Sequence, residues 1–326
     1  MVLARLVSGK LHLGVPDRDR EVLDYPHRGD MRAVRPFIRA AEMALRNMDG
    51  PTEWPEVFWH ICLDSTECGP FYGYLPSSTG LEVGMTAAQL ERLQSQIKAA
   101  FWVTMEHTSV DAKRDAVFGL SAYSAAILAE LMRPGASTSI AARGSLRTLT
   151  EIAITLAYLV KKDDPDVWQQ FRNYGVGRAK LIYMKQEGED SPSFVKTEVL
   201  EALANEDYWE EFTSIELGHW RGRDLRRLAE ATGTKDLYDK YYDWTSHHGH
   251  GHWGAIRESE FLICMNPLHR FHRVLAPQSL PLGDVMPDAV VVVNRLLDWV
   301  RQAYPAADID PPGNPVEAVP RQGESE

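Results

Sequence analysis

The most concentrated group of reactive side chains is the stretch WTSHHGHGHWG at 244–254, which holds four of the eleven histidines and three glycines. Histidine titrates near neutral pH and can serve as a general acid, a general base or a metal ligand. A stripe of polar residues at steps of four runs into this stretch: Tyr238, Tyr242, Ser246 and His250. One helix would carry all of them on a slowly drifting face. Because glycine favours helix termination, we expect that helix to end near His250.

Arg147 and Glu151 form a second candidate pair, four residues apart and therefore on one face of the helix predicted at 137–165. Their neighbours in this helix are almost all apolar. Because burying either charge alone costs several kcal/mol, the two must point outward or pair internally. An exposed pair of this kind contributes only roughly a few tenths of a kcal/mol. The pair therefore indicates either a surface ion pair or part of a buried polar network, and both interpretations stay open.

Metal binding by the histidine stretch is a third interpretation. His248 and His252 could face the same side of a helix, and His107 and Glu151 could complete such a site. Zinc requires three or four converging ligands, however, and the sequence has no nearby Cys pair and no H-E-x-x-H motif. It also lacks a G-x-S-x-G elbow, a P-loop and a G-x-G-x-x-G motif. We therefore expect neither a metal nor a cofactor.

Composition narrows the class of protein. Of the 326 residues, 44% are hydrophobic and 25% charged, which is ordinary for a globular protein. The net charge of −11 argues against a broad DNA-binding face, since phosphate contacts need clustered Lys and Arg. The arginine-rich run at 221–227 is most simply a solvated helix face.

Two further features bear on location. The longest apolar run, AVVVV at 289–293, is far too short to span a membrane. Three cysteines without CxxC spacing favour a reducing compartment over a disulfide framework. We therefore expect a cytoplasmic protein that does not enter a membrane.

From Met85 onward the sequence has a helical pattern. Thr86 and Gln89 form a capping-box signature at the start of the first segment. The segments that apolar spacing and helix breakers predict are 87–109, 111–135, 137–165, 165–184, 194–212, 224–233, 237–249 and 287–304. Gly144, inside the third segment, predicts a close contact with a neighbouring helix.

These segments predict a mainly α fold class, a multi-helix bundle at 86–304. Residues 1–85 are rich in proline, glycine and aromatics, and we expect an irregular region there, apart from a strand at 56–63. Residues 305–326 contain several prolines and no apolar periodicity, which predicts a disordered tail.

Two stretches of the helical region resemble signatures of a bacterial family, domain-of-unknown-function family 5677. The stretch at 141–171, AARGSLRTLTEIAITLAYLVKKDDPDVWQQF, resembles the family's helix with an Arg, a Glu four residues later and then Tyr-Leu. The stretch at 219–251, HWRGRDLRRLAEATGTKDLYDKYYDWTSHHGHG, resembles a second signature. The resemblance spans roughly residues 85–252. It marks as family positions Arg147, Glu151, Trp220, Gly222, Ala229, Glu230, Gly233, Tyr238, Tyr242, Ser246 and His250.

The resemblance implies a relation to helical HEPN-type domains, many of which are metal-independent ribonucleases of prokaryotic defence and toxin systems. It also groups the two sets of polar residues into one candidate site: Arg147, Glu151, Tyr242, Ser246 and His250. In an enzyme acting on RNA, His250 would be the general acid or base and Arg147 would hold a phosphate, with Glu151 and Ser246 orienting them.

A non-enzymatic alternative stays open. The same residues could form a buried polar network that joins helices of a binding or structural module. A homodimer is compatible with a bundle of this kind by analogy alone. The sequence therefore leaves undecided whether the chain is an enzyme.

Overall fold

The computed structural model describes residues 60, 63–64, 66–71, 85–186, 194–204, 224–266, 269 and 272–312. By its internal contacts the chain divides into two compact units. The first comprises residues 1–75 and 256–280, and the second comprises residues 76–255 and 281–326. Within the described ranges, no helix is both long enough and apolar enough to cross a membrane.

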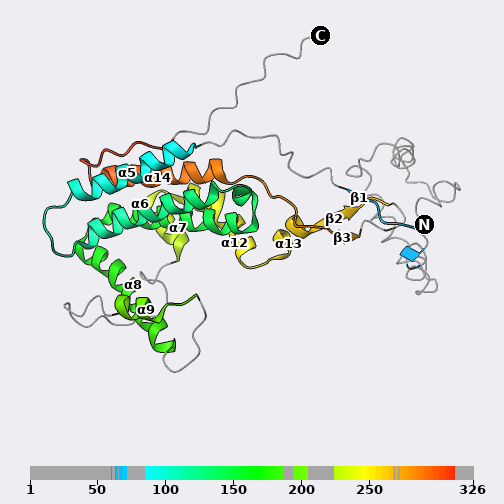
Figure 1. Cartoon of the computed structure of the whole chain (residues 1–326), viewed down its shortest axis with the longest axis horizontal. Coiled ribbons are helices and arrows are strands. Elements are labelled where there is room, and N and C mark those ends of the chain that lie inside the picture. Colours follow the sequence, from blue (N-terminus) through cyan, green and yellow to red (C-terminus); the bar gives the residue numbers. More distant parts are fainter. Residues whose placement is uncertain are drawn as a thin grey trace, which may run out of the picture. The chain divides into compact units, whose positions relative to one another are not determined.

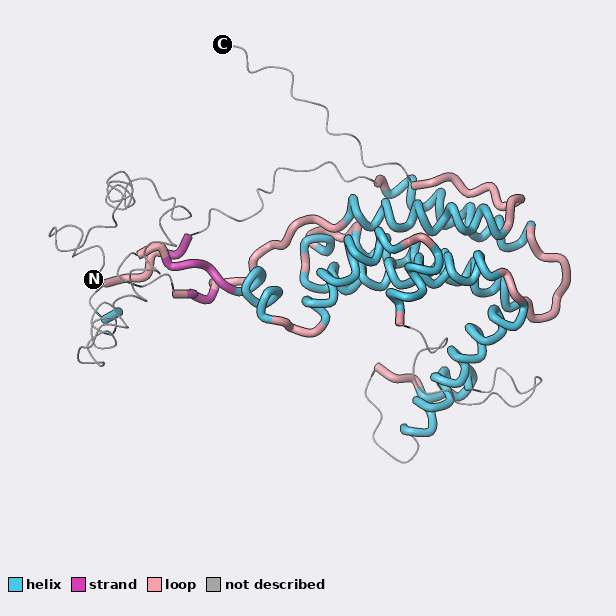
Figure 2. The backbone as a smooth tube through the Cα atoms, turned by 180° about the vertical axis from the view of Figure 1, so that it is seen from behind, coloured by secondary structure: helices cyan, strands magenta, loops and turns pink. Residues whose placement is uncertain are grey.

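The second unit is a bundle of helices, which confirms the mainly α fold (Figure 1). Its elements are α5 (Ala87–Val103), α6 (Ala112–Leu131), η1 (Ala136–Thr138), α7 (Ile140–Lys162), α8 (Pro165–Gln186), α9 (Thr197–Ala204), α10 (Leu225–Thr232), α11 (Lys235–Leu237), η2 (Tyr238–Tyr242), α12 (Asp243–Gly249) and α14 (Met286–Ala303). The predicted capping box is confirmed, because the Thr86 hydroxyl accepts from the Gln89 N–H and the Gln89 side chain accepts from the Thr86 N–H. Helix α8 packs against α9 and α6 (Figure 2).

Helix α7 packs against several other elements of the bundle. It contacts α6, α10, α12, η2 and α14, as expected for a helix that is apolar around most of its circumference. At its start the Ser139 hydroxyl accepts a hydrogen bond of 3.1 Å from the Ala142 N–H. Lys161 and Lys162 in the last turn complement the helix dipole, and Asp163 ends the helix in a left-handed conformation with φ 42°.

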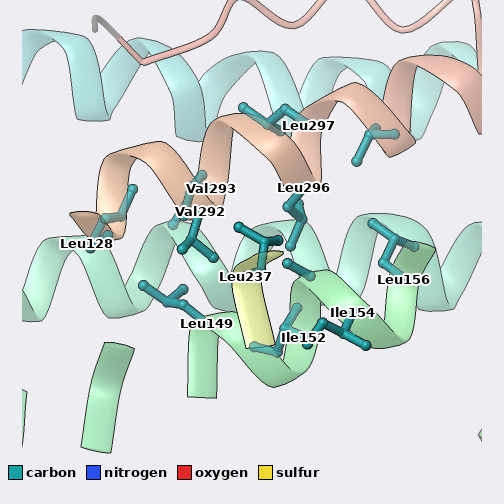
Figure 3. Close-up of a cluster of buried hydrophobic side chains, with 14 of the residues drawn as sticks. Leu128, Leu149, Ile152, Ile154, Leu156, Leu237, Val292, Val293, Leu296 and Leu297 are labelled. Carbon is teal, nitrogen blue, oxygen red and sulfur yellow. The ribbon is translucent and has the colours of Figure 1, made fainter. Parts of the chain in front are cut away.

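The core between α7 and α14 is apolar (Figure 3). Leu149 and Ile152 of α7 face Val292 and Leu296 of α14, and Leu237 of α11 lies between them. Leu149 and Leu296 are both 0% exposed. Full burial of such a side chain stabilises a fold by about 1.5–3 kcal/mol. These contacts hold the helices in place, and the polar residues on the outer part of α7 are positioned by them.

The chain end differs from the predicted disordered tail at 305–326. Residues 305–312 lie against the bundle, with Ala307 and Ile309 buried, and Asp310 forms an ion pair with Arg92. Residues 313–326 lie outside the described residues. The expectation fails for 305–312 because two apolar side chains can anchor a segment that has no periodicity of its own.

Two smaller expectations are also wrong. A Cβ atom built on Gly144 would meet nothing within 4 Å, so no close helix contact requires this glycine.

Within the predicted strand at 56–63, the described residues are His60 and Leu63, and both are helical. Over so short a stretch, apolar and aromatic residues do not distinguish a strand from a helical turn.

The described part of the first unit contains a three-stranded antiparallel sheet in the order β1–β2–β3. Its strands are β1 (Pro70–Phe71), β2 (Phe261–Cys264) and β3 (Arg273–Leu275), and helix α13 (Trp253–Glu260) precedes β2. Pro70 pairs with Cys264, and Leu262 pairs with Val274. The sequence pattern predicts no strand after the first helices, so β2 and β3 are unexpected elements within the predicted 86–304 bundle.

Candidate functional site

Arg147 is the central residue of the candidate site. Its Nε donates a 3.0 Å hydrogen bond to Glu151 Oε1 one turn along α7. Its Nη2 donates a 2.8 Å hydrogen bond to the Tyr242 hydroxyl, and its guanidinium carbon lies 4.8 Å from the centre of the Tyr242 ring. The side chain of Arg147 is 25% exposed and that of Glu151 is 42% exposed. The guanidinium is thus held by two partners, and part of the Arg147 side chain stays open to solvent.

Tyr242 reaches Arg147 at the end of a π-helical turn, η2. A π-helix bonds each residue to the fifth one along the chain, and such turns occur frequently at functional sites. The rings of Tyr238 and Tyr242 stack with centroids 4.8 Å apart and an interplanar angle of 23°. Two of the residues in the predicted polar stripe therefore touch one another, and one of them touches Arg147. We call Arg147, Glu151 and Tyr242 the arginine cluster.

Helix α12 ends in the histidine turn, residues 247–252. His250 is the C-cap of this helix, and its backbone N–H donates to the Ser246 carbonyl at 3.1 Å, which confirms the predicted helix end. The rings of His250 and His252 lie 5.6 Å apart, and both residues are exposed. Among the described residues, neither Ser246 nor His250 has a side-chain hydrogen bond to the arginine cluster.

Within the histidine turn, Gly249 lies against the arginine cluster. A Cβ atom built on this glycine would lie 3.3 Å from Arg147 Nη1. The backbone at the end of α12 consequently lies directly against the guanidinium. Because His250 follows Gly249, an anion bound beside Nη1 would lie next to the histidine turn.

Burial and hydrogen bonds change the pKa of Arg147 in opposite directions, and burial also changes the pKa of the neighbouring Tyr238. Burial lowers the pKa of the Arg147 guanidinium, but the hydrogen bonds with Tyr242 and Glu151 together outweigh it and raise this pKa above its ordinary value. Burial, followed by the nearby Asp243 carboxylate, raises the pKa of Tyr238. Arg147 is therefore positively charged near neutral pH, and this charge is paired with Glu151 at 3.0 Å.

Two tryptophans flank the histidine turn. Trp244 is 56% exposed and Trp253 is 59% exposed. The Trp244 ring stacks with that of His247, with centroids 5.9 Å apart and an interplanar angle of 24°. Exposed aromatic rings can contact the π-faces of nucleobases as well as apolar ligands.

The histidine turn does not form the tightest group of metal-ligating atoms. Among the described residues, that group consists of Cys68, Cys264, His269 and His272 in the first unit. Sequence reasoning misses it because the cysteines lack CxxC spacing. The spacing C-x₄-H-x₂-H from Cys264 to His272 was the signal available, and it is weak without Cys68, which is distant in sequence.

These features define a helical-bundle domain with a partly exposed arginine cluster beside a histidine-rich helix end. Residues 121–264 match the model of the "Family of unknown function (DUF5677)". The resemblance seen in the sequence is thereby confirmed, and all five candidate site residues lie within the matched segment. Comparison with curated proteins and with solved structures gives no match for the chain.

Proposed function

We propose that the chain is a metal-independent hydrolase that cleaves RNA at the arginine cluster and the histidine turn. The observation that carries the proposal is the state of Arg147, which two partners orient, whose side chain stays partly exposed and whose Nη1 lies beside Gly249. A charged donor that is already oriented before the reaction stabilises the charge that develops on a phosphorane. Arg147 therefore takes the role of phosphate ligand, and Glu151 and Tyr242 position it.

The chemistry requires a proton acceptor and a proton donor. In the proposed reaction the ribose 2′-hydroxyl loses its proton to a general base, and its oxygen attacks the adjacent phosphorus. The P–O5′ bond breaks as a general acid protonates O5′, which leaves a 2′,3′-cyclic phosphate and a 5′-hydroxyl. His250 serves as one of these two groups, and His252, whose ring lies 5.6 Å from it, is placed to serve as the other. In the proposal Ser246 orients His250, whose backbone N–H donates to the Ser246 carbonyl at the end of α12.

RNA is a reasonable substrate despite the acidic chain. The net charge of −11 opposes a polyanion, so affinity has to come from local contacts. Trp244 and Trp253 supply exposed stacking surfaces, and Arg147 supplies a local charge. Unstacked bases of single-stranded RNA fit such surfaces better than the bases of a duplex do.

The resemblance to HEPN-type domains supports the same reaction class and links the chain to prokaryotic defence or toxin systems. A cytoplasmic location fits this role, because Cys68 and Cys264 carry free thiols, as proteins in reducing compartments do.

A structural module is the second candidate, and a specific observation favours it. Arg147 joins α7 to η2 through Tyr242, so the arginine cluster also fastens two elements of the bundle. Under this alternative, function would lie on another surface and the exposed His250 would be dispensable.

The test combines an RNA-cleavage assay with thermal unfolding, using the untagged full chain in buffer without added divalent metal ions. We expect single-stranded RNA to be cleaved to 2′,3′-cyclic phosphate products. His250→Gln should lower the rate by at least about tenfold, consistent with removal of a general acid or base, and should leave the Tm unchanged. His107→Gln is the matched control, because His107 is also exposed but lies outside the site.

Arg147→Ala tests the phosphate ligand, with the exposed Arg133→Ala as its control. Loss of cleavage in both His250→Gln and Arg147→Ala, with both controls active, would support the proposal. Absence of cleavage by the wild-type chain, or full activity of His250→Gln, would overturn it. In either of those cases a lower Tm for Arg147→Ala would support the structural module.

A further inference from the structure

The first unit contains four thiol and imidazole side chains whose ligand atoms converge. Cys68, Cys264, His269 and His272 each offer one sulfur or nitrogen atom, and these atoms all lie within 4.8 Å of one another. We call these residues the thiol–imidazole cluster. None of them belongs to the arginine cluster or to the histidine turn, so a role for this cluster is independent of the proposed RNA cleavage.

The small sheet is what brings these residues together. Cys68 lies just before β1, and Cys264 is the last residue of β2. The pairing of β1 with β2, together with a 2.8 Å hydrogen bond from the Met265 N–H to the Gly69 carbonyl, places the two cysteines side by side. The Cys264 N–H in turn donates to the His272 carbonyl at 3.0 Å, which holds His272 beside Cys264.

The distances fit tetrahedral coordination. Cys68 Sγ lies 3.5 Å from His269 Nδ1 and 3.2 Å from His272 Nε2, and Cys264 Sγ lies 3.5 Å from His269 Nδ1. Zinc bonds of about 2.3 Å to sulfur and about 2.0–2.1 Å to nitrogen, at tetrahedral angles, separate such ligand atoms by roughly 3.5 Å. These three sulfur–nitrogen separations are therefore close to those that a bound ion would impose, and all four ligand atoms lie within 4.8 Å of one another.

A second layer of contacts orients His269. Its Nε2 lies 2.7 Å from the Thr66 hydroxyl, and the Asn266 amide donates to that hydroxyl at 3.0 Å and to the Glu67 carbonyl at 2.8 Å. With a proton on Nε2 donated to Thr66, the lone pair of Nδ1 faces the two sulfurs. A metal-binding histidine usually donates its other ring N–H to such a partner, which fixes the tautomer and the ring.

The burial of the ligands gives a reason for a metal. Cys264, at the end of β2, is fully buried, and His269 is 6% exposed. A thiol and an imidazole buried within reach of one another fit a structural metal site, in which the ion satisfies the ligand atoms.

We propose that the thiol–imidazole cluster binds one Zn²⁺ ion as a structural Cys₂His₂ site. Two sulfur and two imidazole ligands in a tetrahedral arrangement favour zinc over the harder divalent ions. On binding, the two thiols each release a proton, and the two thiolates neutralise the double charge of the ion while the imidazoles bind in neutral form. Four protein ligands leave no position for water, so the site holds the sheet together and does not activate a substrate.

The test is elemental analysis of the untagged full chain, purified under reducing conditions without metal-affinity chromatography. We expect one zinc per chain, which is retained on dialysis and is lost in Cys264→Ser and in His272→Gln. The double variant His247→Gln/His252→Gln is the matched control, because it removes two histidines of the histidine turn and should keep the zinc.

Because the single variants could fail to fold, a titration of the wild-type chain provides an independent readout. Protein stripped by chelator and kept reduced should bind one Co²⁺ and develop the visible absorption of tetrahedral cobalt with thiolate ligands. Zinc should displace this cobalt, and the number of reactive thiols should fall by two when either metal binds.

Three results would overturn the proposal. The first is wild-type protein that contains no zinc and gives no tetrahedral cobalt spectrum. The second is zinc that survives Cys264→Ser and disappears in the histidine-turn control. The third is a Cys68–Cys264 disulfide in the freshly purified chain, detected as two missing thiols that chelator does not restore and reductant does.

Discussion

Arg147 and Tyr242 lie 95 residues apart in sequence and are joined in two ways, by a 2.8 Å hydrogen bond to the hydroxyl and by a guanidinium placed 4.8 Å from the ring centre. The hydrogen bond requires the hydroxyl, whereas the cation–π contact requires only the ring. The hydrogen bond and the cation–π contact together hold the π-helical turn η2 against α7. A substitution that removes the hydroxyl and keeps the ring separates their contributions.

Tyr242→Phe removes the hydroxyl and keeps the ring. We expect the free energy of unfolding to fall by about 1 kcal/mol, because a hydrogen bond to a charged group is lost at a site that solvent partly reaches. Urea denaturation monitored by circular dichroism measures the change. Tyr123→Phe is the control, since Tyr123 is 58% exposed, and it should change stability by less than about 0.5 kcal/mol. Equal effects of the two substitutions would contradict the assigned contact.

The sequence predicts those features that depend on residues close in the chain. Thr86 and Gln89 mark the start of α5 because a capping box needs only four consecutive residues. Arg147 and Glu151 pair as the helical spacing predicts, since neighbours four apart always share a face. The end of α12 at His250 follows from glycines within two residues of it.

The sequence does not predict features that depend on contacts between residues far apart in the chain. The approach of Tyr242 to Arg147 passes through a π-helical turn that has no sequence signature of its own. Cys68 meets His272 only because β1 pairs with β2, across 204 residues. Ile309 anchors the chain end although nothing around it is periodic. In each case contacts between residues distant in the sequence decide the local structure, and the local sequence pattern does not.

Gly144→Ala is expected to stabilise the chain. Gly144 lies inside α7 without positive φ, and an added Cβ would meet no atom within 4 Å. Alanine restricts the unfolded chain and favours helix, so we expect a gain of about 0.5–1 kcal/mol in the free energy of unfolding. The measurement is urea denaturation. A loss of stability would mean that this face of α7 is covered by a partner, for example in a homodimer.

Gly249→Ala adds the same methyl group at a position where it would be in tight steric contact with Arg147. The new Cβ would lie 3.3 Å from Arg147 Nη1, and Glu151 and Tyr242 restrain the guanidinium from moving. We therefore expect the helix gain of about 0.5–1 kcal/mol to be largely cancelled. In an Arg147→Ala background the full gain should return, which a double-mutant cycle measures directly. Simple additivity of the two substitutions would show that Arg147 does not press on α12.

Asp163→Asn should destabilise the chain at neutral pH and lose this effect in acid. Asp163 lies 2.7 Å from Lys113 Nζ and accepts a 3.2 Å hydrogen bond from the Trp168 indole. The hydrogen bond with Lys113, opposed by burial and aided by Trp168, lowers the pKa of the Asp163 carboxyl below its ordinary value. The unfolded chain therefore takes up this proton more readily than the folded chain.

By linkage, the stabilisation from Asp163 is complete above about pH 4, the range of an unperturbed aspartate, and is lost as pH falls through the lower folded-state pKa. Asparagine tolerates the left-handed backbone at φ 42°, so the substitution removes charge without adding backbone strain. The Tm difference between wild type and Asp163→Asn should thus be largest near pH 7 and should shrink towards pH 3. Lys113→Gln should behave in the same way, and the double variant should lose little more than either single one, because both changes break one ion pair. A Tm difference that stays constant across this pH range would mean that Asp163 acts through its backbone conformation alone.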